Sequence, residues 1–248
     1  MSEASWIDFY RSDLQAVYLL QLAPLAFLLA RAARLLPGAA ADPGAAGFVR
    51  AWSLVFAVET LLDPWASGPL VHALGWTDTA LHTAVMVGFV LLGDFRVYLL
   101  LFRLASRERA LRAPFARAAR WTLVVPLAAL ALDRGVALAL PERPGQTLWL
   151  VYELLFAGVA LHLRARLPRE LAGPHAAALA RSIRAVCAYA ALYYALWALA
   201  DVLILSGVDA GWGLRVLPNQ LYYGFTVPFV WWAFFARGSR LASFMASK

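Results

Sequence analysis

ALHTAVMVGFVLLGDFRVYLLLFRL, residues 80–104, is long and apolar enough to cross a lipid bilayer as a single helix. The stretch nevertheless carries Asp94 near its middle and Arg96 two residues later. A charged side chain at the bilayer centre costs about 2.5–3.5 kcal/mol on insertion scales, so such residues usually face a protein interior or a water-filled cavity. These residues therefore predict a transmembrane helix that turns a polar face toward other helices.

The whole chain has the composition of a membrane protein. Of its 248 residues, 62% are hydrophobic and 15% are charged, whereas soluble domains carry about 25% charged residues. Its N-terminus lacks the basic region of a secretory signal, so the first apolar run is expected to remain as a span. The repeated apolar runs predict an all-α polytopic membrane protein, a single domain over residues 1–248. Its seven expected spans are 14–35, 49–69, 80–104, 117–140, 146–166, 180–207 and 216–236.

Basic residues predict the orientation of these spans. Most arginines fall on one side of them, in segments 31–50, 103–120, 164–184 and 237–248. Arg11, Arg143 and Arg215 fall on the opposite side. Because basic residues concentrate in cytoplasmic loops, the N-terminus is expected outside and the C-terminus in the cytoplasm, in a bacterial-type inner membrane. This asymmetry also accounts for the net charge of +7, so membrane lipids and no nucleic acid are the expected partners.

Carboxylates outnumber arginines within the predicted spans. Only Arg96 and Arg134 are expected at a depth similar to that of six acids, which are Glu59, Asp63, Asp94, Asp133, Glu153 and Asp201. Asp133 and Arg134 are interpreted as an interfacial pair, and Arg96 is expected to pair with Glu59 or Asp201 on a neighbouring helix. The remaining acids favour a hydrated cavity, with a purely structural polar network as the alternative.

Helical spacing brings several polar side chains to one level, between the outer surface and the membrane midplane. The sequence predicts an outward-opening acidic cavity that binds or translocates a cation, a proton or a proton-coupled small solute. Nearby aromatic rings would contact an organic cation by cation–π attraction. The predicted lining residues are Glu59, Asp63, Asp94, Arg96, Glu153, Tyr194, Trp197, Asp201, Asn219 and Tyr223.

Two short segments support a different hypothesis, an enzyme. Leu91-Leu92-Gly93-Asp94 and Ala198-Leu199-Ala200-Asp201 resemble the two aspartate motifs of the lysoplasmalogenase-like membrane hydrolases. The resemblance implies hydrolysis of a lipid by paired carboxylates acting as acid and base. It covers a dozen positions, the polar residues expected around the motifs are absent, and the number of spans differs. Whether the chain is an enzyme therefore stays open.

Seven spans with an outside N-terminus are also typical of rhodopsins and other seven-helix sensors. A retinal Schiff base requires an amine in the core, and Lys248, at the C-terminus, is the only lysine. Covalent retinal is therefore excluded and no cofactor is expected, while a sensor of a non-covalent ligand remains an alternative. His82 is the one histidine near the acids, so an oxygen-rich metal site that includes His82 also stays open.

Overall fold

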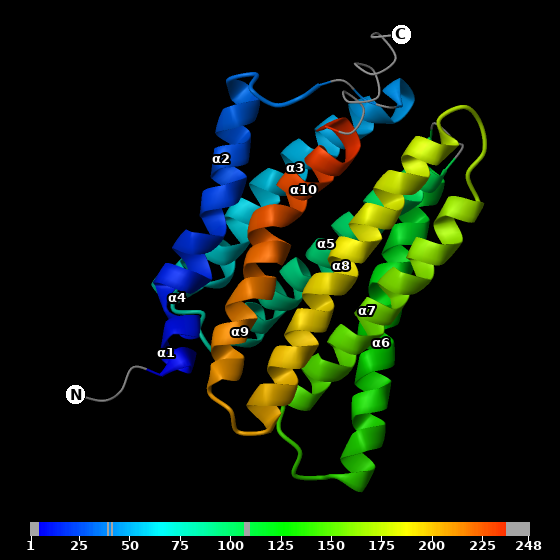
Figure 1. The fold of residues 1–248 in the computed structure, drawn as a ribbon. Helices are drawn as coiled ribbons and strands as arrows, with labels where there is room; N and C mark the ends of the chain where they lie inside the picture. Colours follow the sequence, from blue (N-terminus) through cyan, green and yellow to red (C-terminus); the bar gives the residue numbers. More distant parts are fainter. Residues whose placement is uncertain (1–4, 39, 41, 107–109, 237–248) are drawn as a thin grey trace.

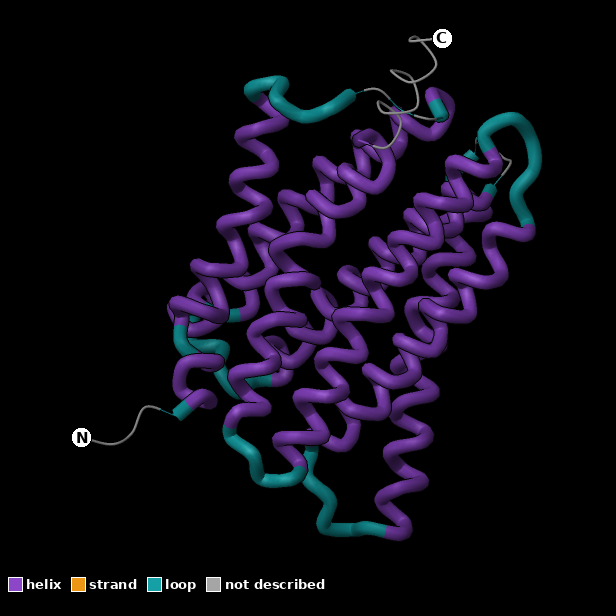
Figure 2. The backbone as a smooth tube through the Cα atoms, in the orientation of Figure 1, coloured by secondary structure: helices purple, strands orange, loops and turns teal. Residues whose placement is uncertain are grey.

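The computed structural model describes residues 5–38, 40, 42–106 and 110–236, which form helices and loops without a strand (Figures 1 and 2). Some of the arginines that predict the orientation lie outside the described residues, as does the single lysine; these are Arg107, Arg109, Arg237, Arg240 and Lys248. The described helices are α1 (Trp6–Arg11), η1 (Leu14–Leu19), α2 (Leu20–Ala32), α3 (Pro43–Ser67), α4 (Pro69–Ala73), α5 (Ala80–Ala105), α6 (Arg112–Ala139), α7 (Gln146–Arg166), η2 (Leu167–Arg169), α8 (Ala176–Leu205), α9 (Ala210–Asn219), η3 (Gln220–Phe225), α10 (Thr226–Trp231) and η4 (Trp232–Ala236).

The long helices run in alternate directions through one bundle (Figure 1). The end of the bundle that carries α1 also carries the α6–α7 and α8–α9 loops, and we call it the α1 end. The α2–α3 and α7–α8 loops lie at the opposite end. Along the bundle α7 packs against α8, and α8 packs against α9.

The prediction of an all-helical membrane protein is confirmed in its coarse form. Among the described residues, 6 helices are long and apolar enough to cross a membrane: Leu14–Ala32, Gly44–Ala73, Ala80–Ala105, Arg112–Ala139, Gln146–Arg169 and Ala176–Leu205. Large apolar side chains are exposed on the outside of the bundle, as expected for a surface that contacts lipid; Leu29, Leu127 and Leu132 are examples.

The last predicted span, 216–236, is helical but irregular. The helix starts earlier than predicted, at Ala210, and π-helical turns divide it at Gln220–Phe225 and Trp232–Ala236. Pro218 and Pro228 lie inside this segment and lack the N–H that a regular helix requires. The irregular backbone leaves carbonyl groups available to side chains, because π-helical turns interrupt the regular ladder.

The helix α3 starts earlier than predicted, because Asp42 caps its N-terminus. The second span is predicted to begin at residue 49, yet α3 begins at Pro43. The Asp42 carboxylate accepts hydrogen bonds from the backbone of Gly44 (2.8 Å) and Ala45 (3.3 Å), and proline is favourable in the first helical turn.

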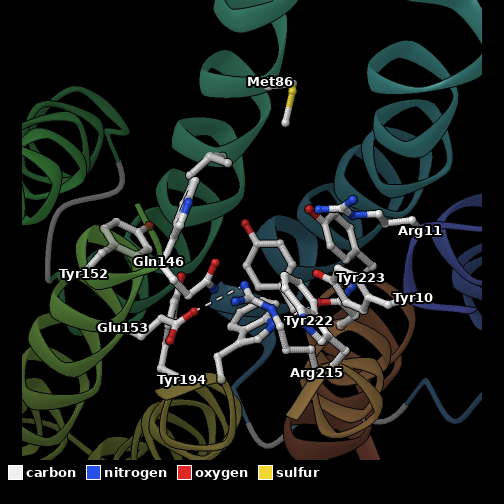
Figure 3. A pocket seen from close by; sticks show the side chains of 15 residues that line it. Tyr10, Arg11, Met86, Gln146, Tyr152, Glu153, Tyr194, Arg215, Tyr222 and Tyr223 are labelled. Atoms are coloured by element: carbon white, nitrogen blue, oxygen red, sulfur yellow. Dashed lines mark hydrogen bonds and ion pairs between the residues drawn. The ribbon is translucent and has the colours of Figure 1, made fainter. Parts of the chain in front are cut away.

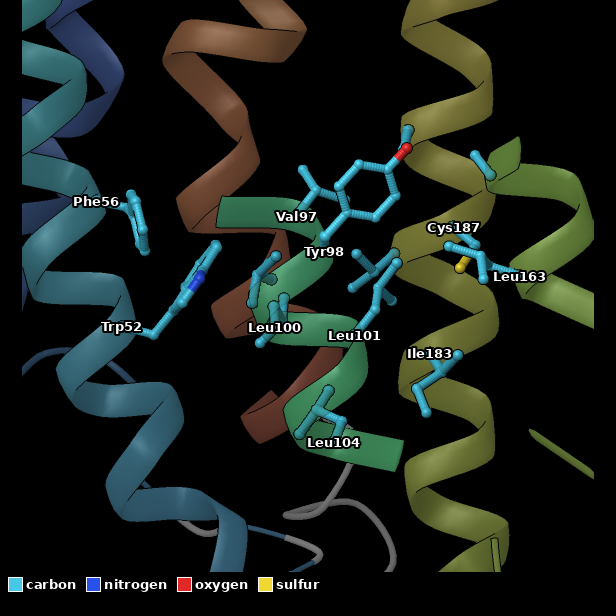
Figure 4. Packing of buried hydrophobic residues seen from close by; sticks show 14 of the residues in the cluster. Trp52, Phe56, Val97, Tyr98, Leu100, Leu101, Leu104, Leu163, Ile183 and Cys187 are labelled. Atoms are coloured by element: carbon cyan, nitrogen blue, oxygen red, sulfur yellow. The ribbon is translucent and has the colours of Figure 1, made fainter. Parts of the chain in front are cut away.

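The apolar core extends along the bundle, from Tyr152 and Trp197 to Leu104 and Ile183. Side chains of α5 lie between α3 and α8 (Figure 4). Trp52 from α3, Leu100 and Leu104 from α5, and Ile183 and Cys187 from α8 belong to one continuous cluster. This cluster packs α3, α5 and α8 together.

Candidate functional site

A cavity of about 490 Å³ opens at the α1 end of the bundle. Its walls come from α1, α5, α7, α8, α9 and η3 and are mainly aromatic (Figure 3). The lining residues are Tyr10, Arg11, Met86, Val90, Gln146, Trp149, Tyr152, Glu153, Tyr194, Trp197, Trp212, Arg215, Asn219, Tyr222 and Tyr223. The volume falls within the range typical of sites for small molecules.

Glu153 is the carboxylate that lines this cavity, and it belongs to a group of three charged residues. Glu153 comes from α7, Asp201 from α8 and Arg215 from α9. The Arg215 guanidinium donates to Asp201 through Nη1, and its Nη2 lies 3.6 Å from Glu153 Oε1 (Figure 3). Arg215 is thus held chiefly by Asp201, and Glu153 is held more loosely.

Asp94 lies behind the cavity wall, where it is 1% exposed. Tyr152 donates to Asp94 Oδ2, and Tyr194 donates to Oδ1 at 2.6 Å. Both tyrosines line the cavity. The hydroxyl groups therefore connect the cavity wall to a carboxyl group that the cavity does not reach directly.

A second ion pair fixes α5 to the irregular last segment. The Arg96 guanidinium bonds Glu59 Oε2 at 3.1 Å and Thr60 Oγ1 at 2.9 Å, and it donates to the Tyr222 carbonyl at 2.7 Å. Arg96 Cζ also lies 4.5 Å from the Tyr222 ring centroid. Because Tyr222 lies in the π-helical turn η3, this guanidinium binds a carbonyl that the turn makes available.

Of the two expected partners of Arg96, the structure shows Glu59, whereas Asp201 pairs with Arg215. Asp63 lies one turn further along α3 and interacts with Ser67, whose Oγ is 3.3 Å from Asp63 Oδ1. The predicted pairing of Asp133 with Arg134 is replaced by another, since Arg143 from the α6–α7 loop donates two hydrogen bonds to Asp133. A loop arginine can fold back onto the helix end, which adjacency in sequence does not reveal.

The structure divides the predicted site residues among three places. Glu153, Tyr194, Trp197, Asn219 and Tyr223 line the cavity, where Trp197 Nε1 donates to Asn219 Oδ1 at 2.8 Å. The others lie outside the lining. Asp94 and Asp201 are bonded to side chains of the lining. Glu59 and Arg96 form the ion pair between α3 and α5, and Asp63 lies one turn from Glu59 on α3.

The two aspartates of the hydrolase-like motifs, Asp94 and Asp201, are bonded to different partners, tyrosines and an arginine respectively. His82 lies at the start of α5, where its Nδ1 is 3.4 Å from the backbone nitrogen of Asp78. Among the residues with described placement, no group of three or more His, Cys, Asp or Glu side chains is arranged to hold a metal ion.

Arg215 is the main site residue that sequence reasoning missed. It was counted as an outside loop residue, but α9 begins at Ala210 and buries it. Tyr152 was also missed, although it adjoins the predicted site residue Glu153. The signal available for Arg215 was its position between apolar residues, which is consistent with a helix that starts before residue 216.

The short helix α1 forms one wall of the cavity. Asp209, just before α9, accepts hydrogen bonds from the Trp6 backbone nitrogen and from Ser5 Oγ, both at 2.8 Å. The Trp6 N–H and then the Ser5 hydroxyl lower the pKa of Asp209 below its ordinary value. Asn219 Nδ2 donates a hydrogen bond to the Tyr10 hydroxyl at 3.4 Å. Asp209 therefore anchors the helix that supplies Tyr10 and Arg11 to the cavity.

No protein-family model, no curated protein and no solved structure matches the chain. The function is therefore inferred from the geometry of the site.

Proposed function

We propose that the protein crosses a bacterial-type inner membrane seven times, with the α1 end outside, and binds a small organic cation in the cavity at that end. Support for seven crossings comes from the six apolar helices together with the helical segment from Ala210 to Ala236. Support for the orientation comes from the arginines of the opposite end, such as Arg31, Arg50 and Arg181.

The orientation has a direct test in intact cells. Single cysteines at residue 172, in the α7–α8 loop, and at residue 208, in the α8–α9 loop, would be placed in a Cys187→Ser background. A membrane-impermeant maleimide should label residue 208 alone. Labelling of both residues, or of residue 172 alone, would contradict the orientation.

Cation binding is supported chiefly by one observation, the Glu153 carboxylate in a cavity with aromatic walls. The faces of tryptophan and tyrosine rings attract cations with about 0.5–2 kcal/mol each. The tryptophans of the lining are Trp149, Trp197 and Trp212, and tyrosines cover much of the remaining wall. A cation of a few heavy atoms could contact several rings and the carboxylate together.

The arginines of the lining do not reverse this charge preference. Arg215 donates to Asp201, so its charge is balanced outside the cavity. Arg11 is exposed and its Cζ lies 5.8 Å from the centroid of the Trp212 ring. Charge selection therefore falls to Glu153, the carboxylate with the looser contact to a cation.

Choline and 3,3-dimethylbutan-1-ol are matched probes, because they have the same shape and differ in charge. We expect choline to change the tryptophan fluorescence of the purified protein at concentrations where the neutral alcohol does not. Glu153→Gln should abolish this preference, while Glu142→Gln, at an exposed loop residue, should keep it. Equal responses to both probes in the parent protein would refute cation binding.

Translocation would require a path past buried apolar residues of α5 and α8, such as Leu100, Leu104 and Ile183. Vesicles that contain the protein should therefore accumulate labelled choline only if the core opens during a transport cycle. Uptake lost in Glu153→Gln would assign transport, and binding without uptake would assign a receptor-like role to the same cavity.

A further inference from the structure

The Glu153–Asp201–Arg215 group lacks one positive charge. Asp201 is 0% exposed and Glu153 is 2% exposed, so both carboxyl groups lie away from bulk water. Arg215 is the one cation bonded to them in the described structure, and a guanidinium stays protonated at any physiological pH. Two ionised carboxylates beside a single arginine leave an unbalanced charge in the interior.

The hydrogen bonds of the group show the same deficit. Glu153 Oε2 and Asp201 Oδ2 are buried, and neither receives a hydrogen bond from any donor among the described residues. The two carboxyl groups nevertheless lie beside the two terminal nitrogens of one guanidinium, Glu153 at Nη2 and Asp201 at Nη1 of Arg215. A proton on either residue would turn one carboxyl into a donor to the other, as in carboxyl pairs that share one proton.

We infer that Glu153 and Asp201 share one proton, and that an organic cation entering the cavity displaces it. The inference rests on the proposed function, because it requires a cation to contact Glu153. The cation brings one positive charge to Glu153, and the shared proton leaves to water in the cavity. One monovalent cation binds and one proton is released, so the charge of the group does not change.

The position of the pair suits this exchange. Glu153 lines the cavity, whereas Asp201 lies behind it and does not. A cation can therefore reach Glu153 while Arg215 keeps its bond to Asp201. After exchange each carboxylate has a positive partner of its own, the cation for Glu153 and Arg215 for Asp201.

Other groups near the pair do not supply the missing charge. On α1, Tyr10 faces Arg215, whose Cζ lies 5.7 Å from the ring centroid. On α7, Gln146 is a neutral neighbour of Asp201. On α5, Asp94 is bonded to Tyr152 and Tyr194, and on α6, Asp133 is bonded to Arg143. Exchange at the pair is thus governed by Arg215 and by what occupies the cavity.

Proton release during choline binding tests the exchange. Purified protein in weakly buffered detergent solution would be titrated with choline beside a pH-sensitive dye. We expect release to approach one proton per bound choline while the pair is protonated. The apparent affinity for choline should then rise about tenfold for each unit increase in pH, because one proton competes with one cation.

Asp201→Asn removes the shared proton and keeps the Glu153 carboxylate that contacts the cation. It leaves Glu153 as the only carboxylate beside Arg215, so choline binding should lose its proton release and its tenfold pH dependence. Glu142→Gln, at the exposed loop, should behave as the parent does. Choline binding without proton release in the parent would overturn the inference alone, whereas no choline binding would refute the proposed function.

Infrared spectroscopy examines the proton without any ligand. The parent should show the carbonyl stretch of a protonated carboxyl group at neutral pH, and both Glu153→Gln and Asp201→Asn should remove the same band. Persistence of that band in both variants, or its absence in the parent, would overturn the inference. This test does not require the variants to bind choline.

Discussion

Gly93→Ala should destabilise the protein by driving α5 away from the irregular last segment. An ideal Cβ on Gly93 would lie 1.6 Å from the Tyr222 Oη, 2.7 Å from Cζ and 3.4 Å from Cε1. An ordinary carbon contact requires about 3.5–4.0 Å, so the Tyr222 ring or the helix must move by roughly 2 Å. Tyr222 has little freedom to move, since its carbonyl is bonded to Arg96 and its ring faces that guanidinium.

Overpacking of this kind typically costs about 1–3 kcal/mol. Gly88→Ala on the same helix is a matched control, because its Cβ would have nothing within 4 Å. That control should be neutral or stabilise the helix by up to about 1 kcal/mol, since alanine has the higher helix propensity. The two substitutions are chemically identical, so their difference reports the contact with Tyr222.

Equilibrium unfolding in mixed micelles with increasing SDS, followed by tryptophan fluorescence, measures the free energy of unfolding of both variants. Tyr222→Phe should restore part of the loss in a double variant, because it removes the 1.6 Å contact and leaves the 2.7 Å contact with Cζ. Equal stability of Gly93→Ala and Gly88→Ala would refute the close packing of α5 against η3.

Three further outcomes follow from the described contacts. Glu59→Gln should lower the free energy of unfolding by about 3–5 kcal/mol in the same assay, because it leaves the buried Arg96 charge without its partner. The docking of α1 should hold above the ordinary pKa of aspartate and loosen as the pH falls through the lowered pKa of Asp209, which a spin label at residue 8 in a Cys187→Ser background would report as increased mobility. Cys187 is 0% exposed, so a maleimide should react with it only after denaturation.

Each of these outcomes has a control. Glu142→Gln, in an exposed loop, should leave the free energy of unfolding unchanged. It shows how little the loss of a surface carboxylate changes stability. Asp13→Asn removes an exposed acid near α1 whose side chain makes no capping hydrogen bond, and it should keep the pH response that Asp209→Asn abolishes. Labelling of Cys187 in the native protein at the rate seen in SDS would contradict its burial in the core.

The membrane-spanning class of the fold was predictable from the chain itself. Apolar runs of helix length, such as residues 80–104, can satisfy their backbone in lipid only as helices, so hydropathy alone specifies them. The sequence also identifies acids within the predicted spans, because Glu59 and Asp201 lie inside predominantly apolar runs. Helical geometry also predicted that Arg96 pairs with Glu59 or Asp201 on a neighbouring helix, because Arg96 points away from Asp94 on its own helix, and the structure decides for Glu59.

Which acid shares a site with which was decided by tertiary structure. Glu153 and Asp201 are 48 positions apart in the chain, and only the packing of α7 against α8 brings them to one arginine. Arg215 joined them because α9 begins at Ala210 and buries a residue that charge patterning placed in a loop. Side-chain partners across helices depend on crossing angle and rotation, and hydropathy carries no information about either, so the cavity and its charge balance emerged from the three-dimensional arrangement.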